Sequence, residues 1–192
     1  IIAIGATALV PPIMGLADMP FLTNETLFDL TSLPRSLAIL GGGPIGSEIA
    51  QAFARLGAAV TLVEALDRVL PPEEPEVSPV ITGSLVADGV EIRTGSGVIA
   101  VESAPGGVRL LFGDESAPAE AAHLLVAIGR APSGRGLGLE EVGVEVDGRG
   151  AVVADDTLRT AVGNIWAIGD VTARLPFTHV ATKMAPVVAA QS

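Results

Sequence analysis

The stretch Ser36-Leu37-Ala38-Ile39-Leu40-Gly41-Gly42-Gly43-Pro44-Ile45-Gly46 joins an apolar run to six residues of which four are glycine. An apolar run bounded by glycine is typical of a buried strand, so we predict a strand over residues 36–40. From Ser47, apolar residues recur at helical spacing until Gly57, which predicts a helix directly after the glycines. The run 59–64 then reads as a second strand. Strand, glycine turn, helix and strand thus fit into about thirty residues, the length of one βαβ unit.

Gly41, Gly43 and Gly46 have the G-x-G-x-x-G spacing of a dinucleotide-binding turn. The first glycine permits the tight turn, the second lets a pyrophosphate approach the backbone, and the third lets the helix pack close to the strand. The phosphates then face the amino end of the helix, where free N–H groups and the helix dipole favour anions. Pro44 and Ile45 lie between the second and third glycines and belong to the same predicted site.

Glu64 ends the second strand, close to the spacing of roughly 20 residues at which such folds place an acid. A carboxylate there accepts hydrogen bonds from the adenosine ribose and repels a 2′-phosphate, so we expect NAD(H) to be preferred over NADP(H). The alternative is a solvated acid at a strand end. Arg68 leaves a second choice open, because it either reaches a 2′-phosphate or pairs with Asp67 or Glu64 at the surface.

Glu48 follows the glycine turn directly, and we expect it in the first turn of the helix. A carboxylate in that position stabilises the helix dipole without any ligand. The functional alternative is that Glu48 points along the cleft toward the nicotinamide end of the cofactor. The sequence favours neither reading over the other.

The rest of the chain predicts an α/β fold of the Rossmann-like FAD/NAD(P)-binding type, with a parallel sheet, helices and an antiparallel β-meander. The meander is expected because short apolar runs alternate with Gly-rich turns where a further helix would otherwise stand. The predicted strands are 1–4, 90–93, 98–103, 108–112, 119–122, 124–128, and two weak ones over 142–146 and 151–153. The predicted helices are 23–30, 75–87 and one from about residue 177.

Composition excludes several classes of function. The 192 residues carry 11 Lys+Arg against 22 Asp+Glu, a net charge of −11, which argues against nucleic-acid and anionic-membrane partners. The absence of cysteine excludes disulfides, thiolate zinc sites and a dithiol redox pair within this chain. The uncharged opening, residues 1–17, lacks a basic flank and is interrupted by Pro11-Pro12, so we expect a cytoplasmic protein without a membrane segment.

Four ordered motifs resemble the pyridine nucleotide–disulfide oxidoreductase family, and within it the dihydrolipoamide dehydrogenases and mercuric-reductase-like members. Together they cover nearly the whole chain, which makes the resemblance more specific than one glycine fingerprint. The motifs are residues 39–71, with the glycine turn and Glu64; Ile1 to Ala6; Leu125 to Pro132; and Ile165-Trp166-Ala167-Ile168-Gly169-Asp170-Val171.

The resemblance implies that different parts of the chain belong to two cofactor-binding domains. Residues 34–132 would form the NAD(P)-binding domain, closed by Gly129, and residues 1–33 and 133–192 would be incomplete pieces of an FAD-binding domain. In the FAD-binding part, Gly5, Gly169 and Asp170 would contact the FAD, and Thr178 and His179 would pass near the flavin. The chain departs from the family pattern at Ile4, Ile128, Ser133 and near Lys183-Met184.

Family features that the chain lacks lead to further expectations. It has no second glycine fingerprint and no cysteine pair, and it begins with Ile1 rather than Met, which indicates a piece of a longer, homodimeric enzyme. We expect this piece to be inactive alone, to hold no FAD, and to self-associate through unpartnered FAD-domain surfaces. The electron acceptor is unspecified. Two alternatives are a non-catalytic NAD(H)-sensing module and a self-contained dehydrogenase, the latter disfavoured because the chain has no Tyr and only one Lys.

Overall fold

The computed structural model describes residues 1–191, which divide into two compact units. The larger unit is residues 8–129, and the smaller unit combines residues 1–7 with the chain from Arg130 onward. The larger unit therefore begins well before residue 34, where the sequence motifs suggested a boundary. The physical reason is that Leu16 and Leu27 are fully buried in the two cores of this unit.

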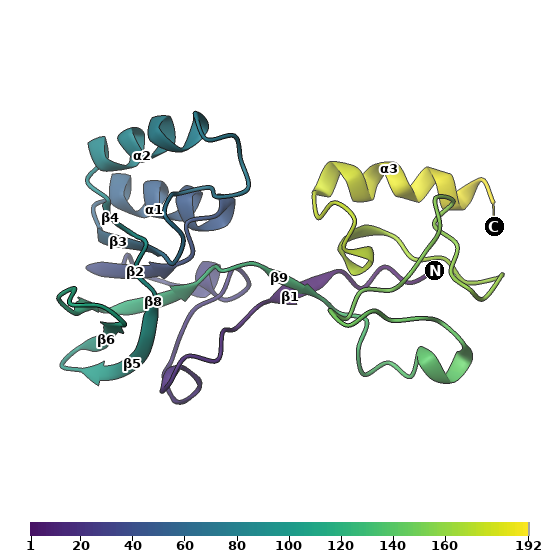
Figure 1. Ribbon diagram of the computed structural model, residues 1–192, viewed down its shortest axis with the longest axis horizontal. Helices are drawn as coiled ribbons and strands as arrows, with labels where there is room; N and C mark the ends of the chain where they lie inside the picture. Colours follow the sequence, from purple (N-terminus) through teal and green to yellow (C-terminus); the bar gives the residue numbers. More distant parts are fainter. Residues whose placement is uncertain (192) are drawn as a thin grey trace. The chain divides into compact units, whose positions relative to one another are not determined.

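The larger unit is built on a sheet of four parallel strands in the order β4-β3-β2-β8 (Figure 1). The chain first adds strands on one side of β2 and later returns to add β8 on its other side. A change of direction of this kind is the point at which open α/β sheets bind ligands. The elements are β2 (Ser36–Leu40), β3 (Ala59–Glu64), β4 (Glu91–Thr94), β8 (His123–Val126), α1 (Pro44–Leu56) and α2 (Val77–Ala87).

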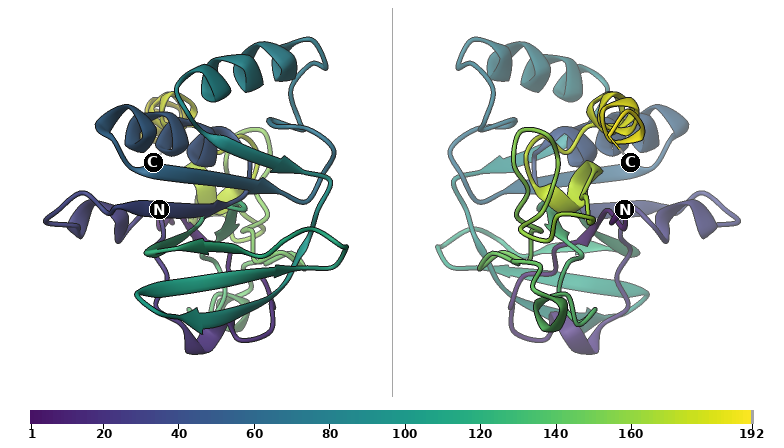
Figure 2. Two further views of the ribbon diagram at one scale, coloured as in Figure 1. Left: turned by 90° about the vertical axis from the view of Figure 1, so that its left-hand side faces the viewer. Right: turned by 90° about the vertical axis from the view of Figure 1, so that its right-hand side faces the viewer.

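Alternate residues of β2 pack into two different cores, because side chains along a strand point to opposite faces of the sheet. Leu37 and Ile39 pack with residues of α1 and α2, whereas Ala38 and Leu40 pack with the antiparallel strands. Those strands form the meander β5-β6-β7, as predicted, with bounds Val98–Ala104, Gly107–Phe112 and Ala119–Ala121. The unit thus has three layers, with the helices and the meander on opposite faces of the parallel sheet (Figure 2).

The smaller unit contains little regular structure besides one helix, α3 (Thr178–Ala189). Its first core surrounds Ala167 and Val171, and its second surrounds Trp166 and Val188 of α3. Three short elements complete it: the 3-10 turns η3 (Glu140–Val142) and η4 (Gly169–Thr172), and strand β9 (Arg130–Pro132), which pairs with β1 (Ala6–Ala8) where the chain passes between units.

The structure corrects several predicted elements. Residues 1–4 form no strand, because only Ile2 bridges Ala167, although this bridge does join the two terminal segments. The predicted helix over 23–30 is a single 3-10 turn, η2 (Leu27–Asp29), since one buried leucine is too little to extend it. The weak strands near 142–146 and 151–153 reduce to one bridge between Val146 and Val152. Strand β8 ends at Val126 rather than at Ile128.

Candidate functional site

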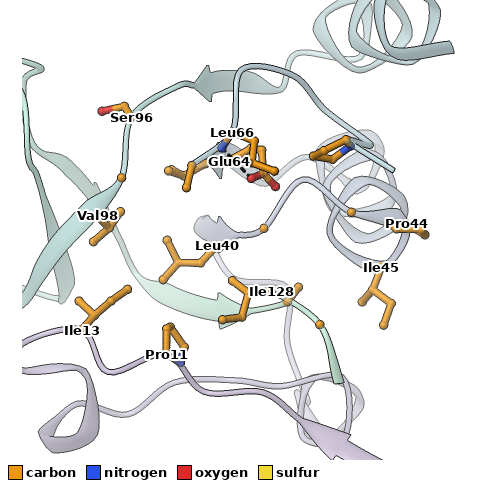
Figure 3. A pocket seen from close by; sticks show the side chains of 18 of the residues that line it. Pro11, Ile13, Leu40, Pro44, Ile45, Glu64, Leu66, Ser96, Val98 and Ile128 are labelled. Carbon is orange, nitrogen blue, oxygen red and sulfur yellow. Dashed lines mark hydrogen bonds between the residues drawn. The ribbon is translucent and has the colours of Figure 1, made fainter. Parts of the chain in front are cut away.

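A cavity of about 620 Å³ opens at the carboxyl ends of β2, β3 and β8, all within the larger unit. Its volume is in the range of small-molecule and cofactor sites. Figure 3 shows side chains that enter it from separate segments, among them Leu40 at the end of β2, Glu64 at the end of β3 and Ile128 just after β8. The sheet therefore gathers at one edge residues that lie far apart in the sequence.

Gly41 and Gly46 are glycines because the protein's own backbone leaves no space for a side chain. Gly41 has φ +108°, and a Cβ there would lie 2.5 Å from the carbonyl oxygen of Ala127. A Cβ on Gly46 would lie 1.9 Å from the carbonyl oxygen of Gly41. The tight turn and the close approach of helix and strand that the fingerprint predicts are both present.

Gly43 differs from these two glycines, because nothing in the described residues requires a glycine there. Its backbone is extended, with φ −71°, and a Cβ there would meet no atom within 4 Å. It nevertheless lines the cavity beside Pro44 and Ile45. A glycine at this position leaves room for something other than the protein.

The amino end of α1 faces the same cavity and is free to bind an anion. Pro44 is its first residue, no side chain caps it, and its first turn holds no acid. Ser47 is the first residue of the helix whose N–H bonds backward, to Gly43 at 2.9 Å. The N–H groups of Ile45 and Gly46 thus have no partner in the described chain, and the helix dipole adds partial positive charge.

Glu64 is held in place by the backbone of two different loops. One carboxylate oxygen accepts the N–H of Gly42 at 2.8 Å, and the other accepts the N–H of Leu66 at 2.9 Å. The first contact ties the acid to the glycine turn, and Figure 3 shows Glu64 beside Leu66 at the cavity. A carboxylate oxygen can accept more than one hydrogen bond, so the acid keeps acceptor capacity for a ligand.

Arg68 makes neither of the surface ion pairs that the sequence allowed. Its Nη2 donates to the carbonyl oxygens of Pro71 at 2.7 Å and Glu73 at 3.0 Å. It forms no ion pair with Asp67 or Glu64, and it is not among the residues that line the cavity. The guanidinium is used inside its own loop, which the sequence could not indicate because these partners are backbone atoms.

The predicted position of Glu48 in the first helical turn is wrong. The helix begins at Pro44, earlier than the apolar spacing indicated, since proline is well suited to a first helical position. Glu48 consequently lies in the second turn. It is exposed and is not among the residues that line the cavity.

The residues that the family resemblance links to FAD lie in the smaller unit. Gly5 and Gly169 have positive φ, at +69° and +74°. Asp170 lies in η4 and pairs at 3.7 Å with Arg130, whose guanidinium also donates to the carbonyl of Ala6. Thr178 and His179 begin α3 and are exposed, and the His179 ring stacks on Phe177 with 5.5 Å between centroids. Gly129, with φ +132°, lines the cavity of the larger unit instead.

Sequence reasoning missed part of the cavity wall. Ser96 is buried, and its hydroxyl donates to Asp114 at 2.6 Å, which together with a hydrogen bond from Ser116 holds the pKa of Asp114 at about 2. No local pattern in the sequence marks Ser96 or the other lining residues that were missed, because only the packing of the meander and the opening segment brings them to the cavity. The other missed lining residues include Pro11, Ile13, Leu66, Pro71, Pro72, Gly97 and Val98.

Residues 1–185 match the family described as pyridine nucleotide-disulphide oxidoreductase. The chain belongs to this family. The oxidoreductases of this family are flavin-dependent and use pyridine nucleotides. The family match confirms the predicted resemblance, and the similar solved structures confirm the α/β fold class. Within the described residues, no helix is long and apolar enough to cross a membrane, and no cluster of His, Asp and Glu could hold a metal ion.

Individual relatives agree with the assignment to the pyridine nucleotide-disulphide oxidoreductases. The chain is 42% identical to a mercuric reductase of Streptomyces lividans over 98% of its length, and 40% identical to a dihydrolipoyl dehydrogenase of Chlamydia pneumoniae over 84%. It covers 40% and 34% of those proteins. A solved structure of the HOCl-induced flavoprotein disulfide reductase RclA from Escherichia coli is similar with a TM-score of 0.92 at 37% identity, covering 98% of this chain and 44% of that one.

Proposed function

We propose that the larger unit binds the pyridine nucleotide of a flavin-dependent disulfide oxidoreductase, with NAD(H) preferred over NADP(H). In the whole protein it would hold the nicotinamide for hydride transfer to FAD, the redox chemistry that these two cofactors supply. The residues that would hold the dinucleotide are Gly41, Gly43, Gly46, Glu64 and the amino end of α1. We propose residues 34–132, most of which lie in the larger unit, as the NAD(P)-binding domain.

Gly43 is the observation that carries the proposal. Neither its φ nor its surroundings require glycine, yet it lies on the cavity beside the uncapped amino end of α1. A pyrophosphate that approaches this backbone would explain the missing side chain, and the free N–H groups would bind its oxygens. The dinucleotide therefore fits the residues that are present.

Glu64 supports the preference for NAD(H). Its two backbone contacts fix the carboxylate at the edge of the cavity, where a ribose hydroxyl can donate to it. A 2′-phosphate in the same place would meet a fixed negative charge. No arginine offsets that charge among the residues lining the cavity, since Arg68 faces its own loop.

The smaller unit is proposed to contribute to an FAD site in the whole protein, through Gly5, Gly169, Asp170, Thr178 and His179. On this proposal the 192-residue chain is inactive as a disulfide oxidoreductase, because it contains no cysteine. We further propose a homodimeric, cytoplasmic whole protein without a nucleic-acid or membrane partner, in keeping with the net charge of −11.

Calorimetric titration with NADH and NADPH tests the proposal. We expect the parent chain to bind NADH at least about tenfold more tightly, equivalent to about 1.4 kcal/mol. Glu64→Gln should narrow the difference, because the amide carries no charge and repels no phosphate. Glu102→Gln is the matched control, since Glu102 is exposed and is not among the residues that line the cavity. Equal or tighter binding of NADPH by the parent chain would disprove the selectivity, and binding of neither ligand would disprove the function.

A further inference from the structure

The loop after β3, residues 65–73, forms one wall of the cavity, and its backbone is unusually constrained. Leu70 has φ +53°, a left-handed conformation that residues other than glycine rarely adopt. Its N–H donates to the carbonyl oxygen of Gly42 at 2.8 Å, so the strained residue is tied to the glycine turn. A conformation of this kind persists only where the surroundings impose it. The loop presents apolar side chains to the cavity, namely Leu66, Pro71 and Pro72.

Arg68 supplies much of that constraint. Its Nη2 holds the carbonyl oxygens of Pro71 and Glu73 together, and both carbonyls follow the strained Leu70. Its Nη1 is buried and has no hydrogen-bond partner among residues 1–191. The guanidinium thus faces into the protein, although exposed arginines normally keep their charged end in water. A second contact holds the same loop. The hydroxyl of buried Ser78 donates to the carbonyl oxygen of Val69, the residue after Arg68, at 2.7 Å.

We propose that Arg68 is a positioning residue that fixes the apolar wall for the adenosine half of the dinucleotide and makes no contact with a 2′-phosphate. The inference rests on the proposed function. Glu64 marks the place of the adenosine ribose, and the amino end of α1 marks the place of the phosphates. The wall adjoins Glu64 through Leu66, so the adenine ring is the part of the ligand that packs against it.

Titration of the complete chain with NADH, NADPH and AMP distinguishes this role from phosphate binding. Arg68→Ala should weaken all three ligands by a common factor of about tenfold, because each carries the adenosine half and the wall serves it alone. If Arg68 contacted the 2′-phosphate, Arg68→Ala would instead weaken the binding of NADPH alone. Arg68→Lys should restore only part of the loss, since one ammonium cannot reproduce the planar fork, whereas a phosphate contact would be restored by its charge.

Two further variants secure the test. Ser78→Ala removes a second contact to the same loop and should weaken NADH, NADPH and AMP by one common factor. This variant tests the role of the loop if Arg68→Ala fails to fold. Arg55→Ala, which removes the ion pair between exposed Arg55 and half-buried Asp88, should leave all three affinities unchanged. A selective loss of NADPH, or unchanged affinities in Arg68→Ala and Ser78→Ala, would overturn the inference. A parent chain that binds no dinucleotide would disprove the proposed function instead.

Discussion

Two glycines of one turn should respond in opposite ways to the same substitution, alanine for glycine. Gly43→Ala is expected to keep the fold and lose the ligand, whereas Gly46→Ala is expected to lose stability. The contrast arises because a Cβ on Gly43 meets no protein atom, while a Cβ on Gly46 lies 1.9 Å from the carbonyl oxygen of Gly41. The pair thus separates a glycine that a ligand requires from one that the fold requires.

The magnitudes follow from these contacts. Gly43→Ala changes the free energy of unfolding by less than about 1 kcal/mol, since its φ suits alanine and only a helix-capping preference is lost. Displacing a phosphate by the added methyl removes a charge-assisted hydrogen bond of about 1.5–3 kcal/mol, which lowers the affinity for NADH by roughly 10- to 150-fold. The overlap at Gly46 forces α1 away from β2 and costs about 3 kcal/mol.

Thermal unfolding and NADH titration on both variants provide the assay. At 2–4 °C per kcal/mol, Gly46→Ala should lower the Tm by roughly 6–12 °C. Gly43→Ala should unfold within about 4 °C of the parent chain and bind NADH weakly. Normal NADH affinity in Gly43→Ala would refute the reasoning, because the open space at this glycine would then have no ligand to explain it.

The 192-residue chain, purified without refolding, should be colourless, because its one G-x-G-x-x-G turn lies in the larger unit and the smaller unit offers Asp170 without a second turn. An absorbance spectrum checks this, and flavin bands near one equivalent would contradict it. The pKa of Asp114 is lowered from 3.8 to about 2 by hydrogen bonds from Ser96 and Ser116, so its contribution to stability is complete above pH 3.8 and disappears as the pH falls through about 2. Titration of the Asp114 carboxyl followed by NMR should give a midpoint near pH 2 in the parent chain and a higher midpoint in Ser96→Ala. A midpoint of 3.8 in the parent chain would contradict the role of these hydrogen bonds.

The central βαβ unit could be predicted from the sequence because its signals are local. Strands β2 and β3 have the predicted bounds, since each is a short apolar run that ends at glycine or at an acid. The antiparallel meander was predicted for the same reason, from its Gly-rich turns. Residues 1–4 have an equally apolar sequence but form only one bridge, because a strand also needs partners along its whole length.

The candidate site was predictable only where the chain itself carries the pattern. The glycine turn and Glu64 were found from spacing, and the cavity lies beside them. The inward direction of the Arg68 side chain could not be predicted, because its partners are backbone carbonyl groups, which every residue possesses. Ser96 and Val98 reach the cavity through tertiary packing, which has no periodic signal in the sequence.

The position of β8 has a consequence for the order in which the site can form. Ala122, just before this strand, donates its N–H to the hydroxyl of Ser36, 86 residues earlier, at the start of β2. The β2-α1-β3-α2-β4 part can assemble from neighbouring segments, but closing so long a loop is slow and must await the meander. During synthesis, the glycine turn is therefore complete long before Ala127, Ile128 and Gly129 emerge to finish the cavity. The residues proposed to hold the pyrophosphate can be in place before the cavity is complete, and a dinucleotide meets the whole cavity only in the finished unit.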